Sequence, residues 1–160
     1  IISQRSLPIL ADDNSALLSE RLARLGGELL LETLPGYLKG ELKPKPQNEA
    51  LATYCKMLKK EDGALDFSCS STSLEHKVRA FQPWPGAFTT WQGQMLKIQR
   101  STAVQTDQLE KSVEPGQHVI YRGLPAIGTG DGLLVLNELQ PAGKKPMHGK
   151  AFLQGARNWF

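Results

Sequence analysis

The sequence predicts an α+β, mainly β chain: one long helix, an extended linker, and a small, closed or partly closed β-barrel with flanking helices. Three patterns predict this order: leucines at helical spacing in residues 14–34, two prolines among lysines in residues 41–60, and short strand-like segments at glycine-rich turns after residue 86. With 160 residues, 40% of them hydrophobic, the chain can bury a core, which excludes wholesale disorder. Its longest apolar run, residues 133–136, is far too short to span a membrane, and we expect no membrane partner.

The first expected element is an amphipathic helix over residues 14–34. Four leucines recur there at steps of four, three and four residues, which places them on one face: Leu18, Leu22, Leu25 and Leu29. Its N-cap candidates are Asp12, Asp13 and Asn14, and Pro35 is expected to end it. Gly26 and Gly27 cost helix stability and are tolerable only if another backbone packs closely there. Because one helix cannot hide this much apolar surface, we expect a partner layer that the chain lacks.

Residues 41–60 are expected to be a linker. Pro44 and Pro46 disfavour helix at the residues before them and keep the backbone extended. The domain boundary is therefore expected near residues 45–60.

After the linker, residues 65–67 are expected to form a short strand, and the pattern Thr72-x-x-Glu75 predicts a helix that ends before Pro83. Five further strands are expected at residues 87–91, 94–104, 118–122, 125–129 and 133–140. Regularly spaced short strands are typical of a small barrel. A final helix is expected over residues 149–158.

The net charge of +3 is unevenly distributed. Residues 41–60 carry five lysines against two glutamates, and residues 141–160 carry four basic side chains and no acid. Such clusters can bind the phosphates of a nucleic acid, although a solvated surface explains them equally well. The candidate RNA-binding residues are Lys56, Lys59, Lys60, Lys144, Lys145 and Arg157.

No motif in the sequence indicates a self-contained catalytic site. Residues 128–132 lack the third glycine of a dinucleotide-binding loop and precede a strand, so they predict a hairpin turn. The three histidines lack metal-ligand spacing, and no metal site is expected. Cys55 and Cys69 form no disulfide framework, which favours reduced thiols and a cytoplasmic location. Trp84, between two prolines, is expected to be structural, as a plug in the core; a base-stacking platform is the alternative.

Several segments of the chain resemble methionyl-tRNA formyltransferases. They are residues 29–35 (LLLETLP), 46–47, 52–54, 56, 59–61, 78–87 (VRAFQPWPGA), 130–134 (GDGLL) and 139–147 (LQPAGKKPM), the last followed by Phe152, Leu153 and Gly155. The likeness covers the whole chain but only the C-terminal half of such an enzyme. It implies that residues 1–40 are the tail of a Rossmann-like formyltransferase domain, residues 41–60 a linker, and residues 61–160 an OB-like, tRNA-binding C-terminal domain.

The resemblance also implies an activity for the parent protein. That enzyme transfers a formyl group from 10-formyltetrahydrofolate to the amino group of initiator methionyl-tRNA. The family's catalytic Asn, His and Asp belong to the N-terminal domain, so no catalytic residue is expected in this chain and no cofactor bound by it. The expected partners are the tRNA and the missing N-terminal catalytic domain.

Two alternatives stay open at this point. One is a related folate-dependent formyltransferase that acts on a small molecule. The lysine-bearing run at residues 139–147 argues against it, because a small substrate needs no lysine strap. The other is a free-standing OB-type RNA-binding module, which the surplus apolar face of the first helix disfavours.

Overall fold

The computed structural model describes all residues, 1–160, and divides the chain into two compact units, Ile1–Met57 and Leu58–Phe160. No helix in it is both long enough and apolar enough to cross a membrane. The linker region, residues 41–60, is exposed throughout and contains no regular element beyond two 3₁₀ turns, at Glu49–Leu51 and from Lys60.

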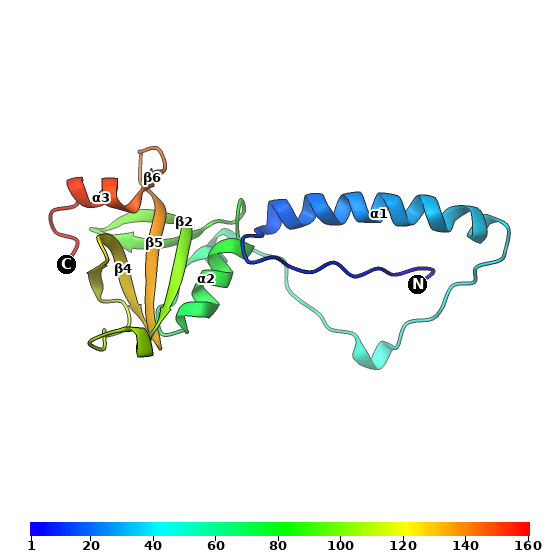
Figure 1. The fold of residues 1–160 in the computed structure, drawn as a ribbon, viewed down its shortest axis with the longest axis horizontal. Helices are drawn as coiled ribbons and strands as arrows, with labels where there is room; N and C mark the ends of the chain where they lie inside the picture. The colour runs from blue at the N-terminus through cyan, green and yellow to red at the C-terminus, as the bar shows by residue number, and fades with distance from the viewer. The chain divides into compact units, whose positions relative to one another are not determined.

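The first unit contains one long helix, α1 (Ser15–Leu38) (Figure 1). Of the three predicted caps, Asn14 is the one used, because its side chain accepts a hydrogen bond from the N–H of Leu17. The predicted end at Pro35 is wrong by one turn. Proline removes only its own N–H, so the N–H of Lys39 still reaches the carbonyl of Pro35 at 3.2 Å and the helix continues to Leu38.

The leucine-rich surface of α1 is only partly covered: Leu18, Leu25 and Leu29 are half-buried, whereas Leu22, Leu30 and Leu31 are exposed. No residue of the helix is buried, and a Cβ added at Gly26 or Gly27 would have no atom within 4 Å. The close backbone contact expected at these glycines is therefore not made within this chain. The preceding extended residues do contact α1 through polar groups: Arg5 pairs with Glu32 at 2.6 Å, and Arg21 donates to the carbonyl of Pro8.

The second unit is built on an antiparallel sheet of six strands with helices α2 (Ser71–Ala80) and α3 (Gly149–Gly155) (Figure 1). The strands are β1 (Ala87–Trp91), β2 (Gln94–Gln105), β3 (His118–Tyr121), β4 (Leu124–Thr129), β5 (Gly132–Pro141) and β6 (Met147–His148). Their order is β1-β2-β5-β4-β3, with β6 paired to β5. The sheet is not closed, so the fold is α+β with an open sheet where a closed or partly closed barrel was predicted.

The predicted strands of this sheet are confirmed to within one or two residues, and so is the turn at Gln92 and Gly93, which has φ of 49° and 73°. Both residues of such a tight hairpin turn need positive φ. The strand predicted at residues 65–67 is wrong: only Ala64 bridges to Phe88, because the chain turns at once through Phe67 and Ser68. The two-residue strand β6 was not predicted.

Helix α2 begins earlier than predicted, and α3 ends earlier. The cap of α2 is Ser70, which accepts from the N–H of Ser73, so the Thr72-x-x-Glu75 pattern lies inside the helix. The carboxylate of Asp131 accepts a second hydrogen bond, from the N–H of Ser71, and so helps to set the residue at which the helix begins. Helix α3 ends at Gly155 where residue 158 was expected, because Arg157 and Asn158 form a turn that folds Trp159 back onto the core.

The core of the second unit lies on both sides of β5. Leu134 and Leu136 point toward α2 and α3, whereas Leu133 and Val135 point to the opposite side, where they pack with Val104 and Ala126. The continuous apolar run of residues 133–136 thus belongs to a strand buried on both faces.

The prediction that Trp84 plugs this core is wrong. Its side chain is 53% exposed, because residues 81–85 form an irregular turn at the surface. The tryptophan that fills the core is Trp159, 1% exposed. It packs edge-on against Phe152 and donates its indole N–H to the carbonyl of Val119 at 2.8 Å.

Candidate functional site

The two adjacent lysines Lys144 and Lys145 lie in a turn between β5 and β6 whose backbone is fixed by hydrogen bonds. The N–H of Lys144 donates to the carbonyl of Pro141 at 3.1 Å, and the side-chain amide of Gln140 donates to the carbonyl of Lys144 at 2.8 Å. Gly143 supplies the left-handed backbone, with φ of 70°, that this turn requires. Both lysine side chains are exposed and neither pairs with an acid. The turn therefore holds two unneutralised cations in a fixed position.

Strand register places a third lysine beside this turn. Gln140, next to the turn, pairs with Lys97 of β2; Lys97 pairs with Phe88 of β1; and Phe88 bridges to Ala64. Lys97 is exposed and points away from the core, since its neighbours Leu96 and Ile98 are buried. With about 4.8 Å between strands, this row spans only about 14 Å. The segment that follows Lys60 therefore lies at the same end of the sheet as Lys144 and Lys145.

The other candidate lysines are less closely placed. Lys59 precedes the 3₁₀ turn Lys60–Gly63, where its backbone N–H donates to the carboxylate of Asp62 at 2.7 Å. Lys56 belongs to the first unit, whose placement relative to the sheet is not determined. Arg157 is exposed and lies in the turn that follows α3, outside the last turn of that helix.

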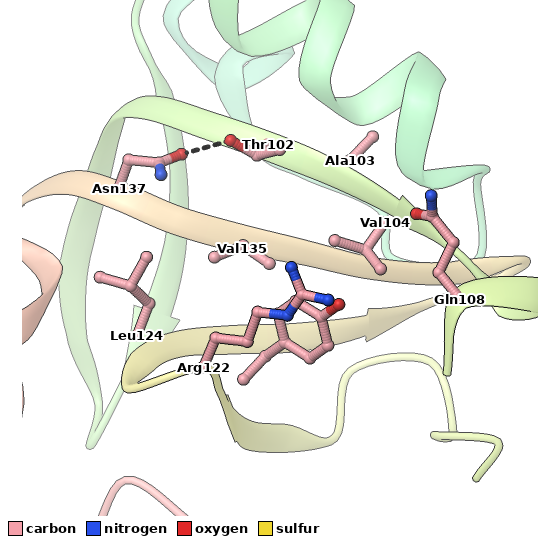
Figure 2. A pocket seen from close by; sticks show the side chains of 9 residues that line it. Thr102, Ala103, Val104, Gln108, Arg122, Leu124, Val135 and Asn137 are labelled. Carbon is pink, nitrogen blue, oxygen red and sulfur yellow. Dashed lines mark hydrogen bonds between the residues drawn. The ribbon is translucent and has the colours of Figure 1, made fainter. Parts of the chain in front are cut away.

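Residues 102–137 enclose a hollow of about 550 Å³ on the side of the sheet opposite α2 and α3. Its walls are Thr102, Ala103, Val104, Gln108, Tyr121, Arg122, Leu124, Val135 and Asn137 (Figure 2). No acidic side chain lines it. The guanidinium of Arg122 lies over the ring of Tyr121, 5.1 Å from its centroid, and Thr102 donates to the side-chain oxygen of Asn137 at 2.9 Å.

Sequence reasoning missed Lys97 as a neighbour of the turn of Lys144 and Lys145, and Arg122 as a wall of the hollow. Alternation along residues 94–98, with Leu96 and Ile98 inward, could have placed Lys97 outward. The position of Arg122 beside residues of β2 and β5 follows only from the order of strands, for which the sequence carries no local signal.

The titratable groups with shifted pKa values lie outside these surfaces. Hydrogen bonds from Ser71, its backbone N–H first, lower the pKa of the Asp131 carboxyl, and the hydroxyl and N–H of Ser68 lower the pKa of Asp66. Burial lowers the pKa of His118, which stacks on Trp159. No three His, Cys, Asp or Glu side chains are grouped closely enough to hold a metal ion.

Comparison with known proteins settles the family. Residues 57–157 match the model of the formyl transferase C-terminal domain. The chain belongs to the formyltransferase family. It is 41% identical, over 98% of its length, to the methionyl-tRNA formyltransferase of Roseiflexus castenholzii, and 43% identical, over 97%, to that of Myxococcus xanthus. It spans about half the length of these relatives, 50% and 48% respectively.

Solved structures of HypX from Aquifex aeolicus share the fold. A variant of HypX from Aquifex aeolicus matches with a TM-score of 0.64 and 19% identity, over 96% of this chain and 28% of the other. HypX in complex with tetrahydrofolic acid matches with a TM-score of 0.54 and 22% identity, over 79% of this chain and 22% of the other. At these identities the likeness concerns architecture alone.

Proposed function

We propose that this chain is the tRNA-binding, C-terminal portion of a methionyl-tRNA formyltransferase. The parent enzyme would transfer a formyl group from 10-formyltetrahydrofolate to the amino group of initiator methionyl-tRNA in the cytoplasm. The observation that carries this proposal is the identity of about 40%, sustained over nearly the whole chain, to relatives named for that activity. Neither alternative left open by the sequence has comparable support.

In this proposal residues 1–40 are the tail of a Rossmann-like catalytic domain, residues 41–60 a linker, and residues 61–160 an OB-like domain. The uncovered leucines of α1 support the first assignment, since Leu30 and Leu31 are exposed on a helix with no buried residue. The missing N-terminal catalytic domain would cover them. Residues 41–60 are exposed and contain no regular element beyond 3₁₀ turns, which supports their assignment as a linker. The antiparallel sheet with a helix packed on its core side supports an OB-like domain in which the barrel stays open.

The proposed contacts to tRNA are phosphate contacts made by lysines. The candidates are Lys56, Lys59, Lys60, Lys144, Lys145 and Arg157, and we add Lys97, because its pairing with Gln140 supports a place beside the turn of Lys144 and Lys145. Lys144 and Lys145 support this assignment best, because a fixed turn lowers the entropy lost when they bind. Contacts of this kind position an RNA without reading its sequence. Because the side chain of Trp84 is exposed, its ring is available to stack on a base of the RNA.

The chemistry of formyl transfer is assigned to the absent half. The resemblance places its Asn, His and Asp there, where they would accept the amine proton and stabilise the tetrahedral oxyanion. We accordingly assign no catalytic residue and no bound cofactor to this chain; 10-formyltetrahydrofolate would bind the parent enzyme elsewhere.

Two measurements on the 160-residue chain test this division of labour. We expect it to bind tRNA at low salt, and to release no formyl-methionine above background when incubated with 10-formyltetrahydrofolate and charged initiator tRNA. Formyl transfer by the chain alone would contradict the placement of catalysis in the other half. Failure to retain tRNA at low salt would contradict the RNA-binding role.

A further inference from the structure

The hollow between β2, β3 and β5 is shaped by an irregularity in the sheet (Figure 2). In the pairing of β2 with β5, Arg100 faces Glu138 and Ser101 faces Leu136, so Asn137 has no partner residue. Such a bulge changes the direction of a side chain and is common beside binding sites. Here the amide of Asn137 lies on the same side of the sheet as Val135, and it lines the hollow.

The polar groups of the hollow that have no hydrogen-bond partner within the protein are mainly donors. The side-chain oxygen of Asn137 accepts from Thr102, and that of Gln108 accepts from the N–H of Gln105 at 3.3 Å. The amide nitrogens of Asn137 and Gln108 make no hydrogen bond in the protein, and Arg122 forms no ion pair. These groups surround an apolar floor that includes Val104 and Val135. A ligand that satisfies them must offer acceptors and a flat apolar surface, and because no acidic side chain lines the hollow, nothing in it favours a cation.

The hollow lies close to the turn of Lys144 and Lys145. Asn137 and Gln140 both point away from α2 and α3, and the three residue steps between them span about 10 Å of strand. Gln140 adjoins the turn of Lys144 and Lys145. The Cε of Lys150 lies 3.9 Å from where a Cβ of Gly123 would stand, next to Arg122. Register between β4 and β5 places Arg122 near the level of Asn137, so these cations lie toward the Asn137 end of the hollow.

We propose that this hollow binds one unpaired nucleotide of the RNA. Arg122, held over the Tyr121 ring, takes the phosphate, and the amide nitrogen of Asn137 donates to a carbonyl oxygen of the base, which lies on the floor of Val104 and Val135. The amide of Gln108 lies at the opposite end of the hollow, beyond the reach of the same base (Figure 2). Proteins that recognise RNA bases bind those that are unstacked and unpaired, because base edges in an RNA duplex are poorly accessible. The proposal rests on the proposed RNA-binding function and adds a site that accepts a base.

The test compares three RNA probes on the 160-residue chain: a short blunt duplex, the same duplex with one bulged uridine, and the same duplex with an abasic bulge. Uridine offers two carbonyl acceptors. We expect the uridine bulge to bind about tenfold more tightly than either other probe, as one seated base contributes on that order. Asn137→Ala and Arg122→Gln should each reduce this preference. Two controls should keep it: Gln108→Ala, which removes an amide at the far end of the hollow, and Arg100→Gln, which removes an arginine outside it.

A second readout protects the test against misfolded variants. In the wild-type protein, the side-chain amide NMR signals of Asn137 should shift with the uridine bulge and stay unchanged with the abasic one. Equal binding of all three probes, with unmoved amide signals, would overturn the nucleotide site while leaving phosphate binding intact. Binding of none would overturn the site and the proposed function together. A preference that survives in both Asn137→Ala and Arg122→Gln would place the base elsewhere and also overturn it.

Discussion

The carboxylate of Asp131 accepts a hydrogen bond of 2.7 Å from the backbone N–H of Ser71, sixty residues earlier in the chain. It thereby ties the turn between β4 and β5 to the first turn of α2, where N–H groups lack partners within the helix. The same contact lowers the pKa of Asp131, because the N–H favours the charged carboxylate. One turn residue therefore fixes both a hairpin and the helix that packs on it.

Asp131→Ala should lower the unfolding free energy by about 1 kcal/mol, the usual cost of losing a helix cap. Since the pKa of Asp131 is lower in the folded protein than its ordinary 3.8, this stabilisation is present above that pH and is lost as the pH falls through the folded value. Urea unfolding at neutral and at acidic pH measures both effects. A difference between wild type and variant that persisted once Asp131 was protonated would contradict the assignment.

A second pH dependence is expected from His118. Folding favours the charged form of Asp131, whereas it favours the neutral form of His118. Its ring stacks on Trp159 with centroids 4.2 Å apart, and burial lowers its pKa, so the folded protein holds it neutral. The unfolded chain binds a proton near pH 6.5, and stability should therefore fall as the pH drops below that value. His118→Phe, which keeps a stacked ring, should flatten the fall in melting temperature. The exposed His76 provides the control, and a flattening by His76→Phe of the same size would contradict the assignment.

The two tryptophans should respond in opposite ways to truncation. Trp159→Ala removes a fully buried ring and should cost about 3–5 kcal/mol, whereas Trp84→Ala should cost less than about 1 kcal/mol, because that ring is half exposed. Thermal unfolding of both variants is the measurement. A large loss at Trp84 would restore its predicted structural role.

The first unit should be the more readily cleaved part of the chain. No residue of α1 is fully buried, and Leu22, Leu30 and Leu31 are exposed. Limited proteolysis should cut within Ile1–Met57 and leave a resistant product close to Leu58–Phe160. Early cleavage inside the sheet, with α1 intact, would show the reverse order of stability.

Much of the sheet could be predicted because its signals are local. Alternation and the left-handed Gln92 and Gly93 located β1 and β2, and the glycines around Asp131 located the next hairpin. The start of α2 was missed because two serines precede Thr72 and a distant aspartate selects between them. Trp84 was misplaced since its exposure depends on a turn that no periodicity describes.

The candidate site was predictable only in part, for the same reason. Gly143 and the prolines around it indicated a fixed lysine-bearing turn, and the structure contains that turn. The proximity of Lys97 to it, and the bulge at Asn137, arise from the register between strands more than thirty residues apart. Side chains on such strands meet only once the sheet has formed.

The claim that the lysine turn binds RNA phosphates is tested most directly by a salt titration of tRNA binding. The protein is the 160-residue chain with Lys144→Ala and Lys145→Ala together, compared with wild type and with a control that removes two exposed lysines elsewhere, Lys39→Ala and Lys111→Ala. Each lost phosphate contact reduces counterion release, so the slope of log affinity against log salt should flatten by about 1–2 in the first variant, for all tRNAs alike. The control should keep the wild-type slope. An unchanged slope and affinity in the Lys144 and Lys145 variant would contradict the account and leave this turn a solvated surface.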